Sequence, residues 1–159
     1  MKIFVNRGGG IYIYYIILIL LLIYISKVDL FDLIIPDSIL LSGAIISLAF
    51  NTTGNGVGFL KSISGCITMV VFTYIIALIM KKIFNEECIG FGDVKLFGMI
   101  GLFLGFNITF IIFIASFYLA SFIGTSYVLY SKFKFGEYNK LIPFAPVISL
   151  ATLFVLLIK

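Results

Sequence analysis

The stretch at residues 11–26, IYIYYIILILLLIYIS, decides the class of this protein because it contains no charged residue. A helix that crosses the hydrocarbon core of a bilayer needs about 20 predominantly apolar residues, and apolar residues continue beyond Ser26 as far as Ile35. The whole chain of 159 residues is 62% hydrophobic and 11% charged, whereas a soluble domain has about 25% charged residues. These values exclude a water-soluble globule and predict a polytopic membrane protein.

Five further apolar stretches follow the first, and together they predict one all-α domain over residues 1–159, a bundle of about six transmembrane helices. They lie at residues 36–50, 59–80, 96–104, 108–130 and 142–158. The fourth and fifth are separated by Gly105-Phe-Asn107 alone, which we interpret as a tight turn. Pro143 and Pro146 fall near the start of the last stretch, where a missing backbone N–H is tolerated.

The charged residues predict how these helices are oriented. Three connections carry seven of the eleven basic residues: Lys27, Lys81, Lys82, Lys95, Lys132, Lys134 and Lys140. All acidic residues fall in the same connections, whereas residues 51–58 and 105–107 carry no charge. The positive-inside rule therefore predicts that the charged connections are cytoplasmic and that both termini are outside. Residues 25–28 offer no small-x-small cleavage site, so we expect the first stretch to remain as a helix.

The remaining side-chain types narrow the chemistry. The chain contains no histidine and two cysteines, Cys66 and Cys88, which are far apart. This spacing indicates neither a zinc cluster nor a disulfide framework, so we expect no metal, no cofactor and two reduced thiols. The basic residues lie beside apolar segments and set topology rather than bind nucleic acid. The lack of histidine also excludes protease mechanisms that depend on that residue.

Two aspartates stand at the ends of predicted helices. Asp29 follows the first apolar stretch by three residues, and Asp93 precedes the fourth by three. Ionisable groups at the membrane boundary are costly and generally face the interior of a bundle, so this placement predicts a functional site. Asp37 has a structural explanation, because it follows Pro36 in the first turn of a predicted helix, where a carboxylate meets the positive end of the helix dipole.

Two facing carboxylates of this kind predict a water-activating pair. Both cannot ionise cheaply in a cleft of low dielectric constant, so they tend to share one proton. One then acts as a base toward water, while its protonated partner donates to the carbonyl oxygen of a peptide bond. This chemistry requires neither histidine nor a metal.

Asp93 belongs to the stretch Gly90-Phe-Gly-Asp-Val-Lys-Leu96. Glycine permits close backbone approach and unusual dihedral angles, which suits an extended substrate passing beside the carboxylate. The structural alternative is a glycine-rich turn in which Asp93 caps the following helix. Lys95 either contacts the aspartates or the substrate, or extends its charge to the membrane surface, and we favour the second reading.

Three segments together resemble the type IV prepilin peptidase family, the aspartic GxGD membrane proteases: residues 29–40, DLFDLIIPDSIL; residues 90–96, GFGDVKL; and residues 142–146, IPFAP. By motif register, the resemblance implies that Asp29 and Asp93 are catalytic. Asp32 competes with Asp29 because it lies three residues further on the same helical face, and the spacing to Pro36 favours Asp29. Residues that support the motif or bind substrate are then Gly90, Gly92, Lys95, Pro36 and Pro143.

The resemblance also implies a substrate and a location. It implies cleavage of the short basic leader of type 4 prepilins or pseudopilins, after glycine, at the cytoplasmic face of the inner membrane of a bacterium. The long form of the family has an N-terminal segment with paired CxxC motifs, whereas residues 7–10, RGGG, precede the first apolar stretch here. We therefore expect a short form with peptidase activity and without N-methyltransferase activity.

Other interpretations remain open at this point. A small transporter or channel subunit would use the aspartates as a cation or proton site, although such sites usually lie near the membrane midplane. A family member that has lost activity and serves as an assembly scaffold is a third possibility. Glu86 and Glu87 either attract a basic leader or form a solvated loop, the reading we favour.

The spacing of Gly101 and Gly105 allows close helix contact of the small-xxx-small type. It suits either a groove for the apolar helix of a substrate or packing within the protein, and we favour packing. The sequence does not specify an oligomeric state or a particular prepilin.

Overall fold

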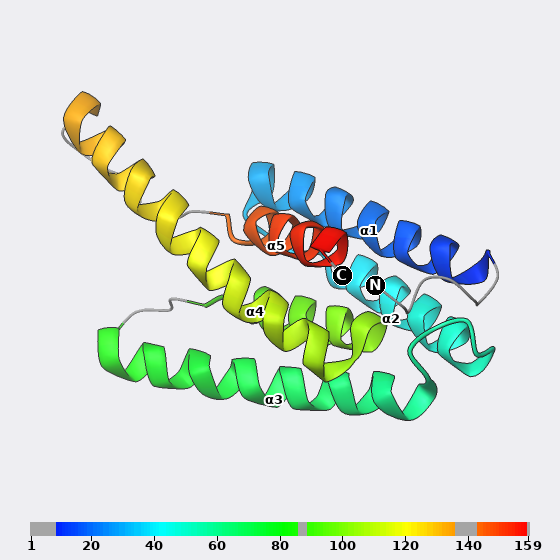
Figure 1. Ribbon diagram of the computed structural model, residues 1–159. Coiled ribbons are helices and arrows are strands. Elements are labelled where there is room, and N and C mark those ends of the chain that lie inside the picture. The colour runs from blue at the N-terminus through cyan, green and yellow to red at the C-terminus, as the bar shows by residue number, and fades with distance from the viewer. Residues whose placement is uncertain (1–8, 86–88, 136–142, 159) are drawn as a thin grey trace.

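The computed structural model describes residues 9–85, 89–135 and 143–158, and within these residues it contains helices and no β-strand. The five helices are α1 (Gly10–Asp32), α2 (Asp37–Thr52), α3 (Phe59–Phe84), α4 (Phe91–Phe135) and α5 (Ala145–Ile158). They pack into one bundle in which neighbouring segments run back and forth (Figure 1). The predicted all-α class is confirmed.

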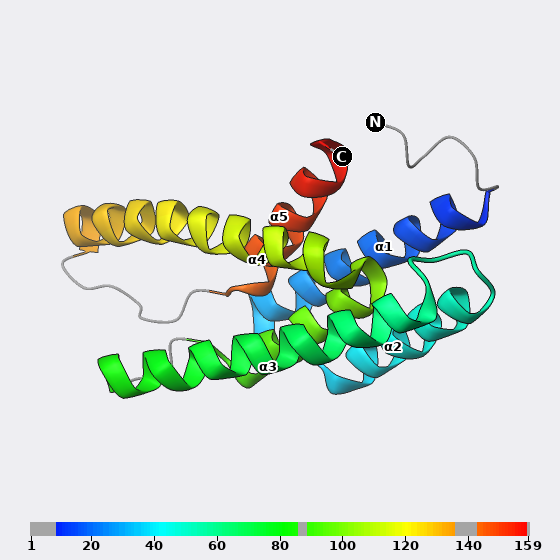
Figure 2. The same ribbon diagram turned by 60° about the horizontal axis from the view of Figure 1, so that its bottom comes forward.

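Helix α4 is interrupted at Gly105, whose φ of 74° and ψ of 172° are not helical. A positive φ is costly for residues with a Cβ, so glycine is the residue suited to this position. Figure 2 shows the chain turning back at the end of the first half of α4, so that the second half runs the other way. The break predicted at residues 105–107 is therefore confirmed, although the first half of α4 begins at Phe91, earlier than expected.

Three helices are long and apolar enough to cross a membrane: α1, α3 and the part of α4 from Phe91 to Ser126. Helices α2 and α5 are apolar but shorter. Large apolar side chains are exposed on the outside of the bundle, among them Leu20 and Ile79. These features define a helical membrane bundle, and the number of crossings remains a prediction.

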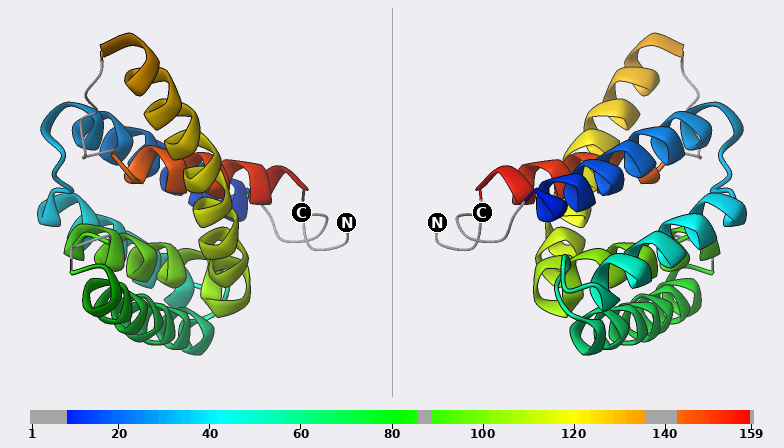
Figure 3. Two further views of the ribbon diagram at one scale, coloured as in Figure 1. Left: turned by 90° about the vertical axis from the view of Figure 1, so that its left-hand side faces the viewer. Right: turned by 90° about the vertical axis from the view of Figure 1, so that its right-hand side faces the viewer.

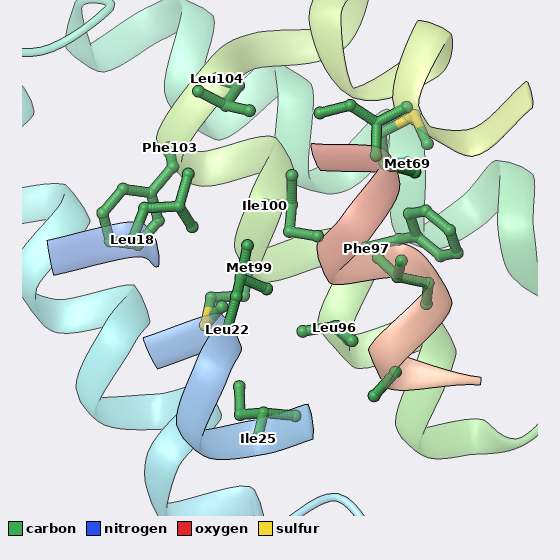
Figure 4. Packing of buried hydrophobic residues seen from close by; sticks show 14 of the residues in the cluster. Leu18, Leu22, Ile25, Met69, Leu96, Phe97, Met99, Ile100, Phe103 and Leu104 are labelled. Atoms are coloured by element: carbon green, nitrogen blue, oxygen red, sulfur yellow. The ribbon is translucent and has the colours of Figure 1, made fainter. Parts of the chain in front are cut away.

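The first half of α4 forms the centre of the bundle. Its side chains Leu96, Phe97, Ile100 and Phe103 are fully buried. Figure 4 shows them facing Leu18, Leu22 and Ile25 from α1 and Met69 from α3. Figure 3, which views the bundle from the two sides of Figure 1, shows this segment between α3 and the adjacent helices α1 and α5. The helix that carries Asp93 is thus enclosed by the rest of the protein.

Helices α3 and α4 approach closely through glycine. A Cβ added to Gly65 would lie 2.6 Å from the carbonyl oxygen of Gly101, and one added to Gly101 would lie 2.7 Å from that of Gly65. The Cβ at Gly65 would also lie 2.8 Å from the Cα of Gly105. The glycine spacing in α4 therefore serves packing within the protein, the reading favoured above.

At the end of the bundle near Gly105, a set of polar groups is buried among four helices. We call it the Tyr14–Asn51 network; it comprises the side chains of Tyr14, Ser47, Asn51 and Ser62 and the carbonyl oxygens of Leu102 and Phe103. Asn51 Nδ2 donates to the Tyr14 hydroxyl oxygen at 2.9 Å, and Ser62 Oγ donates to the Leu102 carbonyl at 2.7 Å. Asn51 Oδ1 accepts the Gly58 N–H at 3.0 Å. The network joins α1, α2 and α3 to the turn before the break in α4.

Candidate active site

Asp29 lies in the last turn of α1, where its side chain is buried, with 6% of the residue exposed. Its Oδ2 accepts a hydrogen bond of 2.9 Å from the backbone N–H of Ala145, the first residue of α5. An N–H in the first turn of a helix has no partner within that helix, and the positive end of the dipole of α5 faces the carboxylate. Helix α1 ends just after this residue, where Leu33 adopts a left-handed conformation and donates its N–H to the Asp29 carbonyl.

Asp93 lies in the first turn of α4 and is also buried, with 9% exposed. Its Oδ2 accepts the N–H of Gly90 at 3.2 Å, while the carbonyl of Gly90 accepts the N–H groups of Asp93 and Val94. The contact from the Asp93 side chain back to the Gly90 N–H is one of the two hydrogen bonds of a capping box. Gly90 has no side chain that could make the other. Asp93 therefore does cap α4, the role considered as an alternative above, and the cap fixes the carboxylate at the start of the central helix.

The two glycines of the motif leave room for specific neighbours. A Cβ at Gly90 would lie 3.2 Å from Asp93 Oδ2, and a Cβ at Gly92 would lie 3.1 Å from the Cβ of Ile35 in the connection between α1 and α2. Both separations are tighter than ordinary van der Waals contact. Gly90 and Gly92 thus shape the surroundings of Asp93 and allow the α1–α2 connection to pack against α4.

The structure brings Asp29 and Asp93 together at one end of the bundle, where α1 ends and α4 and α5 begin (Figure 1). They are close enough for their negative charges to repel. Two like charges shielded from water are costly, so such a pair tends to hold one proton between its members. Asp32, the competitor for the first position, is exposed and does not share this burial.

Lys95 forms an ion pair with Asp37, the residue that follows Pro36. Lys95 Nζ lies 2.7 Å from both carboxylate oxygens of Asp37, and it lies 5.0 Å from the centre of the Phe91 ring. Pro36 is the N-cap residue of α2, and Asp37 lies in the first turn of that helix, as predicted. Lys95 therefore connects α4 to α2 through Asp37.

The start of α5 is defined by two prolines. Pro143 precedes the helix, and Pro146 is its second residue, a position that tolerates the missing N–H. Between them, Ala145 is almost fully buried and directs its N–H to Asp29. The sequence analysis missed this contact, because a backbone group carries no signal in its residue type; the small residue between two prolines was the available hint.

Two serines that the sequence analysis did not single out lie one turn from this contact. Ser26 Oγ on α1 donates to Ser149 Oγ on α5 at 2.8 Å, and Ser149 Oγ donates to the carbonyl of Pro146 at 2.8 Å. The two hydroxyls join α1 to α5 next to Asp29.

No group of three or more histidine, cysteine, aspartate or glutamate side chains able to hold a metal comes together within the described ranges. Cys66 on α3 is a free thiol. Glu86, Glu87 and Cys88 lie outside the described residues. What the described site offers is a pair of buried carboxylates and the backbone N–H groups that hold them, a set suited to proton transfer with water.

A membrane bundle with two buried carboxylates at one end is the class that the fold and the site define. Residues 16–127, which include both aspartates, match the type IV leader peptidase family. This chain belongs to that family.

Two curated proteins are similar to the chain. The prepilin leader peptidase/N-methyltransferase of Pectobacterium carotovorum subsp. carotovorum is 27% identical over 92 residues, which are 58% of this chain and 33% of that protein. The prepilin leader peptidase/N-methyltransferase of Aeromonas hydrophila is 25% identical over 130 residues, which are 82% of this chain and 44% of that protein. The matched part of the chain thus covers less than half the length of either relative. No solved structure gave a significant match.

Proposed function

We propose that this chain is an aspartic endopeptidase of the bacterial inner membrane that removes the short basic leader from type 4 prepilin-like proteins. The observation that carries the proposal is the burial of Asp29 and Asp93 at one end of the bundle, close enough for their charges to interact. Membership of the type IV leader peptidase family and the names of the two curated relatives support it.

The proposed reaction uses the aspartates as a pair that holds one proton. The ionised carboxylate takes a proton from water as the water oxygen attacks the carbonyl carbon of the peptide bond, and the protonated partner gives its proton to the carbonyl oxygen. The C–N bond then breaks as the first aspartate passes its proton to the amine nitrogen. A hydroxyl proton of the intermediate returns to the second aspartate, which restores the starting state.

The position of the pair suits a substrate that enters from the cytoplasm. The positive-inside rule predicts that the charged connections, and with them both aspartates, lie at the cytoplasmic face. A prepilin-like leader is short, basic and cytoplasmic, and the cut after its final glycine lies where the leader meets the apolar helix of the substrate. That helix stays in the membrane during cleavage, so an active site at the membrane boundary meets the scissile bond.

Our proposal covers the peptidase activity alone. The names of both relatives also include N-methyltransferase activity. Asp29 and Asp93, which support the peptidase, lie in the segment that matches the family, and we assign no described residue to methyl transfer.

The test is cleavage of prepilin-like substrates in membranes that contain this chain. We expect the substrate to lose its leader, seen as a gel shift, and N-terminal sequencing to place the new N-terminus directly after the leader glycine. If the chain cuts none of several prepilins while it is present and folded, the peptidase proposal is wrong. Ion-flux measurements in liposomes would then examine the aspartates as a cation or proton site.

A further inference from the structure

The two aspartates are held in different ways. Asp93 accepts an N–H from its own helix start at 3.2 Å, a local contact between residues three positions apart. Asp29 accepts the N–H of Ala145 at 2.9 Å, across 116 residues of sequence and from another helix. The position of Asp29 relative to its donor therefore depends on how α5 is seated against α1.

A pair of serines links α5 to α1 beside this contact. Ser26 precedes Asp29 by three residues on α1, and Ser149 follows Ala145 by four residues on α5, so each lies one turn from the Asp29–Ala145 contact. The 2.8 Å bond from Ser26 to Ser149 continues to the Pro146 carbonyl through the second hydroxyl. Ser26 Oγ also lies 2.7 Å from the Leu22 carbonyl of its own helix. Two hydrogen bonds one turn apart thus connect α5 to α1, one to Ser26 and one to Asp29.

The shorter contact favours the charged form of Asp29. Hydrogen bonds to a carboxylate from N–H groups favour its ionised state, and the N–H of Ala145 belongs to the positive end of a helix. The backbone of Phe144 interacts with the same carboxylate. In a pair that shares one proton, the carboxylate with the stronger set of donors is the ionised member.

Few charged groups lie on the described helices around Asp29. Asp93 on α4 is the charged group that interacts with it. The described residues of α5 and its start, 143–158, include no titratable side chain. On α1 and α2, Lys27 and Asp32 are exposed and Asp37 is paired with Lys95. Which of the two aspartates is ionised therefore depends on their backbone donors and on the charge of the other aspartate.

We propose that Ser26 and Ser149 are positioning residues, which seat α5 so that the N–H of Ala145 keeps Asp29 ionised as the base of the pair and leaves the shared proton on Asp93. The inference rests on the proposed peptidase function. It assigns the first proton transfer, from water, to Asp29, and the proton given to the peptide carbonyl oxygen to Asp93. Neither serine touches the reacting atoms.

The experiment compares Ser26→Ala, Ser149→Ala and Ser26→Thr with the parent, with kcat and KM for prepilin cleavage measured across pH. Ser116→Ala is the matched control, because Ser116 is a buried serine whose hydroxyl bonds the Phe113 carbonyl within α4. Resistance of each variant to thermal unfolding in detergent shows whether it is folded at the assay temperature.

We expect both Ala variants of the pair to lower kcat by about 3- to 10-fold, as for one lost hydrogen bond of ordinary strength, with KM unchanged. The acidic limb of the kcat profile should move to higher pH by about half a unit, because the singly protonated pair, with its charge on Asp29, has lost support and takes up a second proton more easily. Ser26→Thr keeps a hydroxyl and should restore both values, and Ser116→Ala should leave both unchanged.

Two results would overturn the inference. One is an effect of the Ala variants no larger than that of Ser116→Ala. The other is a loss of kcat without movement of the acidic limb or without recovery in Ser26→Thr, which would mean a general structural role. Failure of the peptidase proposal is a separate result, since the parent itself would then cleave no prepilin.

Discussion

The two ends of this bundle both bury polar side chains, and they do so in opposite ways. The Tyr14–Asn51 network combines neutral donors and acceptors, so the Asn51 amide, the Ser62 hydroxyl and the Leu102 carbonyl satisfy one another. At the other end, Asp29 and Asp93 are acceptors whose charges repel. A satisfied neutral network makes a helix arrangement rigid, whereas a buried pair of like charges costs stability.

This difference predicts that one end of the bundle contributes stability and the other end the proposed catalysis. The first half of α4 connects the two ends, since Asp93 lies in its first turn and Leu102 and Phe103 lie in its last. The Tyr14–Asn51 network anchors the first half of α4. Asp93, at the other end of this segment, is therefore carried by a rigid helix. The expected effects of substitution therefore fall on catalysis at one end and on the free energy of unfolding at the other.

The sharpest way to test the contrast is to neutralise each aspartate. Asp29→Asn and Asp93→Asn each remove a group that transfers protons, so we expect prepilin cleavage to fall by about 100- to 10,000-fold. The free energy of unfolding should change little or increase, because an amide is less costly to bury than a carboxylate that ionises or must hold a proton. Cleavage in membranes at matched expression, followed by N-terminal sequencing, measures the rate.

Asp32→Asn is the control for this pair, because Asp32 is exposed one turn from Asp29. It should cleave at nearly the rate of the parent. Full activity in Asp93→Asn, or loss in Asp32→Asn with Asp29→Asn active, would contradict the assignment of the pair.

At the neutral end, Asn51→Ala should act on stability. It removes the donor to Tyr14 and the acceptor for the Gly58 N–H, and leaving such groups unpaired costs about 1–3 kcal/mol each. We expect a lower midpoint of thermal unfolding in detergent, with kcat nearly unchanged at temperatures where the variant is folded.

Asn55→Ala is the matched control at the same end, since Asn55 is exposed and its amide makes a long 3.4 Å contact to Thr53. Its unfolding midpoint should stay near that of the parent. Loss of kcat in folded Asn51→Ala would show that the two ends are not separable.

The pH dependence of the cleavage rate tests whether Asp29 and Asp93 share one proton. At low pH both aspartates are protonated and the base is lost, and at high pH both are ionised and the proton donor is lost. We therefore expect a bell-shaped profile that falls about tenfold per pH unit on each limb. The limbs report the pair rather than either aspartate. A flat profile from acidic to neutral pH, under conditions where chemistry is rate-limiting, is the result that contradicts a shared proton.

The smallest effect is expected at the ion pair between Lys95 and Asp37, whose side chains are 38% and 71% exposed. An exposed pair of this kind contributes about 0–1 kcal/mol, so Asp37→Asn should lower the unfolding midpoint slightly. Salt screens such pairs, so the difference from the parent should shrink at high ionic strength. Asp32→Asn removes the same charge from another exposed site and controls for net charge. A large loss of activity in Asp37→Asn would place this pair in the catalytic machinery.

Much of the fold was predictable from the sequence, because a bilayer imposes simple rules on composition and length. The apolar stretches located all five helices, and the glycine at position 105 located the break in α4. The start of α4 was placed too late, since Asp93 and its neighbours were assigned to a loop. The capping contact with Gly90 extends the helix to Phe91.

The candidate site was predictable in part. Asp29 and Asp93 were predicted from their position at helix ends and from motif register, and both are buried where α1 ends and α4 begins. The sequence did not separate Asp29 from Asp32 by residue type, and burial now distinguishes them. The contacts of Ala145 and of Ser149 with α1 join residues more than 100 positions apart. Such contacts depend on how helices pack, which helical periodicity alone does not specify.

The unequal lengths of the helices have a consequence for the surrounding lipid. Helix α2 has 16 residues and presents Leu41 and Ile45 on its outer surface, whereas α3 has 26 residues. At 1.5 Å per residue, α2 is about 24 Å long and α3 about 39 Å, against a hydrocarbon core of about 30 Å. This is a hydrophobic mismatch, and a short apolar helix relieves it by thinning the bilayer beside it. If α2 crosses the bilayer, as the sequence predicts, we expect the lipid beside it to be thinner than the lipid beside α3.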